Sequence, residues 1–205
     1  MSTQQSKPTG RDLFEANKAL KDLKNNKFAL KYSSLNLDSA KIVVFCDASY
    51  GNLADGSSQG GHIVFMSDET GTCSPINWSS RKLKRVVRST LAAETLAAVE
   101  SLDSAYLVGN LFAEIFSETK MREIEIHTEN RSLYDTVKTS NVPEDKRLRI
   151  DIAALRETLE KDGVTFNWIS GNKQLANALT KKGASKQLLQ NVLTVAHLGG
   201  QSLIY

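Results

Sequence analysis

The order of apolar and polar positions predicts a helix followed by several strands in the first part of the chain. From residue 10 to 26, leucine, phenylalanine and alanine recur at helical spacing with lysine and aspartate between them, as in an amphipathic helix. Residues 28–37 alternate loosely and fit an extended connector. The run Lys41–Asp47 is almost wholly apolar, which is typical of a strand covered on both faces. Residues 60–66 and 72–79 indicate two more strands, and the short connections favour an antiparallel meander.

The second part of the chain alternates helical and extended patterns. A long helix is expected from about residue 88 to 116, because apolar side chains recur there at three-to-four spacing. The other expected elements are strands at 123–128 and 164–169 and helices at 131–139, 144–161, 173–181 and 185–192. This order predicts an α/β fold in which helices flank a mixed, five-stranded sheet.

Composition restricts the class of protein only moderately. The 205 residues are 40% hydrophobic, which is enough for a sizeable core. A formal net charge of +3 permits nucleic-acid binding without demonstrating it. Cys46 and Cys73 fall in expected strands, so we expect buried free thiols rather than a disulfide. No apolar run approaches the ~20 residues of a membrane helix, and residues 1–8 lack the apolar stretch of a signal peptide, so an intracellular protein is expected.

Acidic and amide side chains follow the ends of the expected strands. Asp47 ends the first strand, and Glu94 lies on the long helix. Glu129 follows the fourth strand, and Asn177 comes just after the fifth. Sites in open sheets form outside strand ends, and divalent cations prefer carboxylate oxygens. The pattern therefore indicates a metal-dependent nuclease centre, in which paired ions would flank a phosphodiester.

Six short motifs give the chain a specific resemblance. They are Asp47-Ala-Ser-Tyr-Gly-Asn52, Gln59-Gly-Gly-His62, Ile76-Asn-Trp-Ser-Ser80, Arg88-Ser-Thr-Leu-Ala-Ala-Glu94, Asp145-Lys-Arg-Leu-Arg-Ile-Asp151 and Gln174-Leu-Ala-Asn-Ala-Leu-Thr-Lys181. In this order the chain resembles the ribonuclease H domain of a copia-type retrotransposon Pol polyprotein. The resemblance covers about residues 41–182. Residues 1–40 would then be a tail and a connection helix that follows the reverse transcriptase, and residues 183–205 a closing helix and tail.

The resemblance implies an activity, a cofactor and partners. The family cleaves RNA in RNA–DNA hybrids with two Mg²⁺ or Mn²⁺ ions. Its acids follow the order Asp, Glu, Asp, Asp, which falls on Asp47, Glu94, Glu129 and Asn177, and Asp47 would bridge both ions. The implied partners are the hybrid and the reverse transcriptase domain of the same polyprotein, with no membrane. The implied location is a cytoplasmic retrotransposon particle or the nucleus.

Two of the four positions depart from the family pattern. Asn177 has no charge to attract a divalent ion, and Glu129 is longer than aspartate by one methylene. A displacement of ~1 Å at an active site can cost on the order of 10²-fold in rate, so we expect weakened activity. Asp145 and Asp151 are nearby acids that could substitute, although apolar neighbours favour a surface or structural role for Asp151.

A basic run and several small polar residues are the candidate nucleic-acid contacts. The cations are Arg81, Lys82, Lys84, Arg85 and Arg88, and the small polar residues are Ser49, Asn52, Ser89, Thr90 and Asn130. The cations would hold phosphates, and the polar groups suit 2′-hydroxyls; the run also fits a solvated loop. Trp78, His62 and His127 are expected to pack in the interior.

Three interpretations stay open at this point. The chain is an active but slow nuclease, a degenerate domain that binds hybrids or scaffolds a polyprotein, or an unrelated mixed-sheet domain whose acids lie on the surface. A metal-dependent cleavage assay separates the first two interpretations.

Overall fold

The architecture follows from a computed structural model that describes residues 8–25, 28–117, 122–139, 141–161 and 164–199. The outermost parts of the two expected tails lie outside these ranges. The elements in chain order are α1 (Gly10–Asn25), η2 (Leu37–Ser39), β1 (Lys41–Ser49), β2 (Gln59–Ser67), β3 (Cys73–Lys82), α2 (Thr90–Ile115), β4 (Ile124–Thr128), α3 (Arg131–Lys138), α4 (Lys146–Lys161), β5 (Thr165–Trp168), η3 (Gly171–Lys173), α5 (Asn177–Thr180) and α6 (Gln187–Val195).

The strands form a five-stranded mixed sheet in the order β3-β2-β1-β4-β5, as the sequence predicted. β1 pairs with β2 and β2 with β3 in antiparallel fashion, which is the expected meander. β4 pairs in parallel with both β1 and β5. β1 is therefore the central strand, and its interior residues are all buried. Burial on both faces explains its nearly unbroken apolar run.

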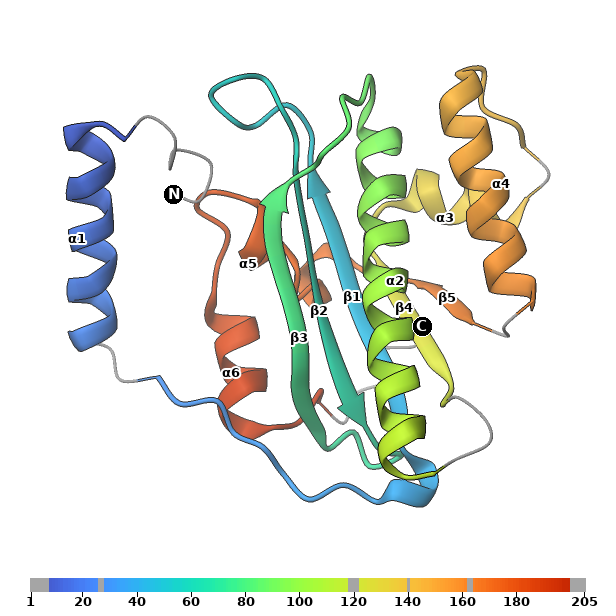
Figure 1. The fold of residues 1–205 in the computed structure, drawn as a ribbon, viewed down its shortest axis with the longest axis horizontal. Coiled ribbons are helices and arrows are strands. Elements are labelled where there is room, and N and C mark those ends of the chain that lie inside the picture. The colour runs from blue at the N-terminus through green and yellow to red at the C-terminus, as the bar shows by residue number, and fades with distance from the viewer. Residues whose placement is uncertain (1–7, 26–27, 118–121, 140, 162–163, 200–205) are drawn as a thin grey trace.

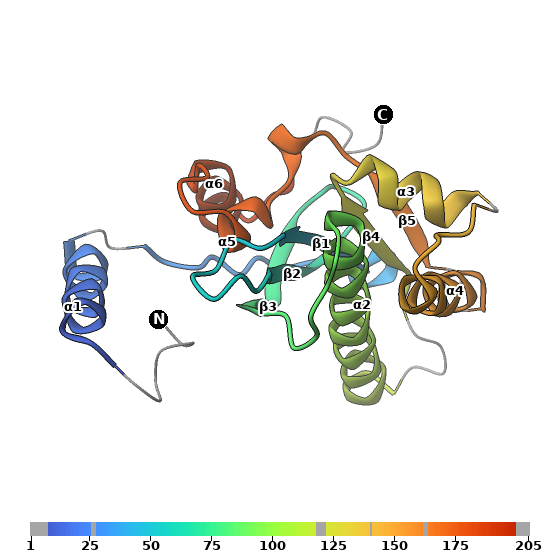
Figure 2. The ribbon, with the colours of Figure 1, turned by 90° about the horizontal axis from the view of Figure 1, so that it is seen from above.

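Helices cover both faces of the sheet and create two main cores. α2 crosses one face, with α3 and α4 beside it (Figure 1), and this side holds the larger core, with Ile42, Val44 and Ile126. α5 and α6 lie on the opposite side (Figure 2), where Phe45, Phe65 and Leu193 belong to a second core. The Ser89 hydroxyl accepts a hydrogen bond from the Ala92 amide at 3.1 Å and so begins α2. A cap of this kind contributes about 1 kcal/mol.

The first helix behaves differently from the rest. α1 has no buried residue and stands apart from the sheet (Figure 1). Its apolar side chains are exposed, among them Leu13, Phe14 and Leu23. The helix itself was predicted correctly from the amphipathic pattern at residues 10–26. Among the described residues, no helix combines the length and apolar character needed to cross a membrane.

Other expectations for buried side chains are confirmed, with one exception. Cys46 and Cys73 are buried free thiols, and His62 and His127 are buried. The expectation for Trp78 was wrong, because its side chain is 53% exposed. It lies on the edge strand β3, where only Cys73, Ser74 and Pro75 are buried.

The expected continuous helix at 173–181 was also wrong. The segment forms η3 and then the short α5, separated by Gln174–Ala176. The buried Gln174 amide donates to the Cys46 carbonyl at 3.0 Å, while its oxygen accepts from the Ala176 amide at 3.1 Å. The Gln174 side chain therefore bonds both to the central strand and to a backbone amide of its own segment. That amide is then not available to a regular helix.

Candidate active site

The four sequence-predicted positions come from four elements. Asp47 lies near the end of β1, and Glu94 lies in the first turns of α2. Glu129 directly follows β4, and Asn177 is the first residue of α5. Because β1 and β4 run parallel, their final residues meet at the same end of the sheet. The fold therefore brings these positions to one end of the sheet, as the sequence predicted.

Gly61 allows α5 to approach Asp47. Gly61 is the partner of Asp47 in the β1–β2 register. A Cβ atom at Gly61 would lie 2.8 Å from Cγ2 of Thr180 and 3.0 Å from Cβ of Leu179. These separations are too short for any other residue unless α5 moves away. The glycine thus lets the Thr180 hydroxyl donate to Oδ2 of the fully buried Asp47.

Lys181 connects Asp47 to Glu129. Its Nζ atom lies 3.2 Å from Oδ1 of Asp47, close enough for an ion pair but without the alignment of a hydrogen bond. The same ammonium donates to Oε1 of Glu129 and, at 2.5 Å, to Oδ1 of Asn177. Burial opposes the charge of Lys181, yet the contacts with Glu129 and Asp47 outweigh it and raise the pKa of this ammonium. Lys181 is therefore a cation inside the acidic cluster, the group formed by the side chains of Asp47, Glu94, Glu129 and Asn177.

Asn177 faces Glu129 as a donor. Its Nδ2 atom donates to Oε2 of Glu129 at 2.8 Å and to the Gly171 carbonyl at 3.2 Å. A Cβ atom at Gly171 would lie 2.9 Å from Oε2 of Glu129, so the glycine makes room for this longer carboxylate. Both oxygens of Glu129 are engaged by donors from the same short segment. An aspartate at 177 could not donate in this way.

Glu94 has the most perturbed carboxyl of the cluster. Its side chain is 4% exposed, and Oε2 accepts no hydrogen bond. Burial, reinforced by the charge of Asp47, raises the pKa of Glu94 to about 8, although Lys181 and Asn130 act in the opposite direction. Burial also raises the pKa of Asp47 against the effects of Thr180 and Lys181. Desolvated carboxylates with coupled charges are typical of functional sites.

The two parts of the cluster differ in how well they fit a divalent ion. Asp47 and Glu94 each keep one buried oxygen without a hydrogen bond, although Nζ of Lys181 lies 3.2 Å from that of Asp47. Buried carboxylate oxygens of this kind suit a hard cation. Glu129 and Asn177 do not fit a second ion, because an ammonium and an amide already engage their oxygens. Within the described ranges, no three His, Cys, Asp or Glu side chains form a group that could hold a metal.

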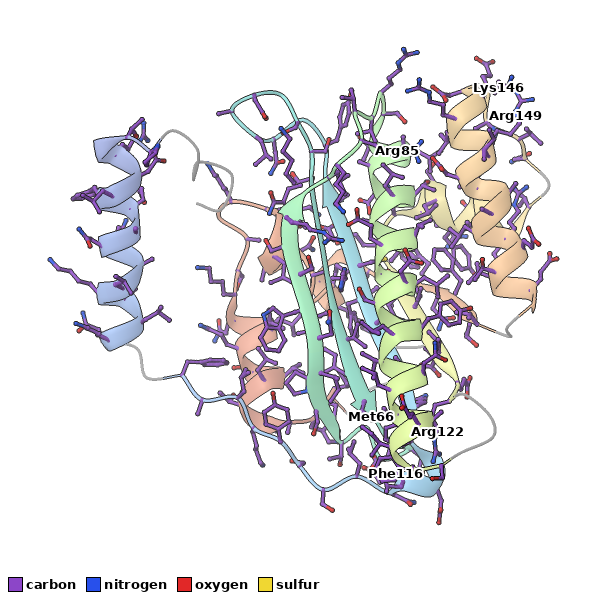
Figure 3. The ribbon with its side chains drawn as sticks, in the orientation of Figure 1. Met66, Arg85, Phe116, Arg122, Lys146 and Arg149 are labelled. Carbon is purple, nitrogen blue, oxygen red and sulfur yellow. The ribbon has the colours of Figure 1, made fainter. Side chains whose placement is uncertain are left out.

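The predicted basic contacts are partly engaged in ion pairs. Arg81 pairs with Glu100, Lys82 with Asp55, and Arg85 with Asp151 at 2.9 Å. Lys84, Arg85 and Arg88 lie in the loop between β3 and α2, residues 83–89, which is called the basic loop below. The loop approaches α4 at the end of the molecule where β1 ends (Figures 1 and 3). Figure 3 shows Arg85, Lys146 and Arg149 gathered at this end, so α4 adds cations that the sequence analysis did not include.

The predicted small polar contacts mostly have structural partners. Asn52 donates to the Thr180 carbonyl at 3.1 Å, and Asn130 accepts from the Leu133 amide at 2.8 Å to begin α3. Ser89 begins α2, with Thr90 as its first helical residue, and Ser49 is the last residue of β1. The contact of these five residues with nucleic acid stays a prediction.

The two substitute acids do not join the cluster. Asp145 is exposed and accepts from the Arg147 and Leu148 amides at 2.8 and 3.1 Å at the start of α4. Asp151 pairs with Arg85. Both acids have structural roles at the contact between the basic loop and α4, as was favoured for Asp151.

No protein family model and no curated protein matches this sequence. Solved structures do. One is LC11 ribonuclease H1, isolated from compost by a metagenomic approach, with a TM-score of 0.51 and 17% identity over 68% of this chain and 92% of that chain. The chain has a ribonuclease H-like fold. Another similar solved structure is that of the foamy viral protease–reverse transcriptase in complex with an RNA/DNA hybrid. Its TM-score is 0.51, with 18% identity over 88% of this chain and 21% of that chain.

Sequence reasoning missed three residues that contact or support the cluster. Thr180 and Lys181 contact Asp47, and Gln174 anchors their segment. All three belong to the motif Gln174–Lys181, so a signal was present. Their roles depend on how closely α5 approaches β2, which spacing along the chain does not reveal.

Proposed function

We propose that this chain is a ribonuclease H domain of low activity that cleaves RNA in RNA–DNA hybrids. The observation that carries the proposal is the buried pair Asp47 and Glu94, whose charges are coupled at the end of the central strand. Burying two acids together is costly unless a cation compensates them. Their order along the chain is the one that the ribonuclease H resemblance implies.

A divalent ion fits the proposal at the Asp47–Glu94 pair. Mg²⁺ or Mn²⁺ held there would act as a Lewis acid toward a phosphoryl oxygen. Asp47 is held in place by the Thr180 hydroxyl, and Glu94 by the helix that Ser89 begins. Nζ of Lys181 lies 3.2 Å from Oδ1 of Asp47, so the ion would compete with this ammonium, which agrees with a low activity.

The proposed substrate position lies across the acidic cluster and the basic loop. Lys84, Arg85 and Arg88 would hold phosphates near the acids, because cationic side chains provide most of the affinity for a nucleic-acid backbone. The 2′-hydroxyls that distinguish RNA from DNA would be contacted by small polar side chains, namely those of Ser49, Asn52, Ser89, Thr90 and Asn130. This arrangement suits a hybrid whose RNA strand crosses the acids.

The proposed setting is a copia-type retrotransposon polyprotein with a reverse transcriptase as partner. The six motifs support this setting, and so does the match to part of a protease–reverse transcriptase chain. In this setting, α1 would connect the two domains. The domain would work inside cells, in a cytoplasmic particle or in the nucleus.

A second function is favoured by one specific observation. The Lys181 ammonium and the Asn177 amide engage both oxygens of Glu129. The family pattern implied by the resemblance has aspartates at both 129 and 177. Such a site suits a degenerate domain that binds hybrids or scaffolds a polyprotein without cutting.

A cleavage assay and a binding assay together decide between the two functions. A hybrid with labelled RNA is incubated with the protein in Mg²⁺, in Mn²⁺ and in EDTA, and binding is measured separately in EDTA. The nuclease proposal expects slow cleavage of the RNA strand that requires the ion. Binding without cleavage supports a degenerate domain that binds hybrids. A protein that neither binds nor cuts the hybrid contradicts the nuclease and the hybrid-binding domain, and leaves only the scaffold.

A further inference from the structure

In the acidic cluster, the ammonium of Lys181 lies between the carboxylates of Asp47 and Glu129. Nζ of Lys181 is 3.2 Å from Oδ1 of Asp47, 2.5 Å from Oδ1 of Asn177 and in contact with Oε1 of Glu129. All three acceptors are oxygens of the kind that a divalent ion would take. The position is thus filled by a cation that the chain itself supplies.

The backbone holds Lys181 in this position. The Lys181 amide donates to the Asn177 carbonyl at 3.0 Å at the end of α5. α5 in turn is seated against Gly61, the register partner of Asp47. The side chain of Lys181 is 37% exposed and that of Asp47 is 0% exposed, so the ammonium reaches inward from the rim. This contact differs from an exposed surface ion pair, because one partner is fully buried.

We infer that the Lys181 ammonium takes the place of a second divalent ion, so that the cluster is assembled without metal and binds at most one such ion. The inference concerns the same cluster as the proposed function and rests on it for the place of the remaining ion. The physical reason is charge compensation: the ammonium contacts the carboxylates of both Asp47 and Glu129, so it already offsets part of their mutual repulsion.

Replacing Lys181 tests the inference through stability. The melting temperatures of the wild type and of Lys181→Met are compared in EDTA and in millimolar Mn²⁺. In EDTA the variant should melt several degrees lower, because each kcal/mol corresponds to about 2–4 °C in a chain of this size. Mn²⁺ should restore most of this loss, so that the gain from Mn²⁺ is larger in the variant than in the wild type.

Mn²⁺ titration gives a second measure. The wild type should bind at most one ion, and Lys181→Met should bind one more or bind the first at least ~10-fold more tightly, because an opposing charge has been removed. Two ions bound by the wild type would overturn the inference.

Lys182→Met is the matched control, since Lys182 is the exposed neighbour and has the same charge. It should match the wild type in both measurements. If Lys182→Met and Lys181→Met have equal effects, or if Lys181→Met melts lower and Mn²⁺ restores nothing, the inference is overturned.

A double variant separates charge from packing. Lys181→Met combined with Glu129→Gln should recover at least half of the stability that Lys181→Met loses in EDTA, because the uncompensated carboxylate is removed as well. No recovery would mean that the lysine acts through packing, and this result would also overturn the inference.

These measurements require neither hybrid nor cleavage. If the hybrid is not cut but the Mn²⁺ results appear as expected, the proposed function fails and the inference stands. If the hybrid is cut and the wild type binds two ions, the inference fails and the proposed function stands.

Discussion

The two halves of the acidic cluster show opposite solutions to the cost of buried charge. The half formed by Asp47 and Glu94 keeps two buried oxygens without hydrogen bonds, and its pKa values are raised. The half formed by Glu129 and Asn177 is satisfied by donors from α5 and by Lys181. The donors of α5 and Lys181 thus satisfy the second half, whereas Oε2 of Glu94 in the first half has no hydrogen-bond partner and Oδ1 of Asp47 has only the ion pair with Lys181. If the proposed function holds, the cluster would therefore take one divalent ion rather than two.

Removing the charge of Asp47 should have the largest effect. Asp47→Asn should reduce hybrid cleavage to background, because the variant removes a carboxylate that would hold the divalent ion. This is the carboxylate that Thr180 and Lys181 contact. Circular dichroism should show an intact fold. Asp103→Asn, an exposed acid on α2, is the matched control and should cleave like the wild type. Equal cleavage by both variants would place the chemistry elsewhere.

Replacing Glu129 and Asn177 by the aspartates of the family pattern should increase the activity of the second half of the site. Glu129→Asp together with Asn177→Asp should raise ion-dependent cleavage by on the order of 10²-fold, because misplacement of ~1 Å costs about that much. Single-turnover rates with labelled hybrid measure the gain. If the double variant binds hybrid but cuts no faster than the wild type, these two positions do not limit the reaction.

Glu94 should make stability depend on pH. Its pKa is about 8 in the folded protein against an ordinary value of 4.5, so the unfolded chain releases the proton first as pH rises. The contribution of Glu94 to stability is therefore full below about pH 4.5 and declines up to about pH 8. Each pH unit in this interval is worth about 1 kcal/mol. Urea unfolding at pH 5 and pH 8, in EDTA, should show a steeper decline for the wild type than for Glu94→Gln; parallel declines would contradict the burial of this carboxyl.

The basic loop should have the smallest effect. Lys84→Ala and Arg88→Ala should each weaken hybrid binding at low salt and reduce the slope of log affinity against log salt by about 1. Lys18→Ala, on the separate helix α1, should leave the slope unchanged. A loop that serves only as a solvated connection would give the same slope in all three variants.

The sequence predicted much of this molecule because its strands and helices have distinct periodicities. The apolar run at 41–47 predicted the central strand, and the polar residues after the strands predicted which side chains gather at one end of the sheet. Trp78 was misjudged because burial on an edge strand depends on which helices cover it. The helix expected at 173–181 is interrupted because Gln174 bonds to backbone groups of β1 and of its own segment.

The role of Lys181 could not be predicted for a different reason. Its reach to Asp47 depends on Gly61, which lies far away in the sequence and matters only through the β1–β2 register. The domain boundaries at 40 and 182 stay predictions, although the second core includes Leu189 and Leu193 of α6. Contacts formed between distant segments therefore account for most of what the sequence did not reveal.

The most direct test of the contrast between the two halves is to measure how many Mn²⁺ ions bind to the wild type and to Asp47→Asn. Titration calorimetry measures this number, as does the electron paramagnetic resonance signal of free Mn²⁺. The wild type should bind one ion, and Asp47→Asn should bind none. A wild type that binds no ion, or an Asp47→Asn protein that binds it equally well, would show that the buried pair is not a cation site.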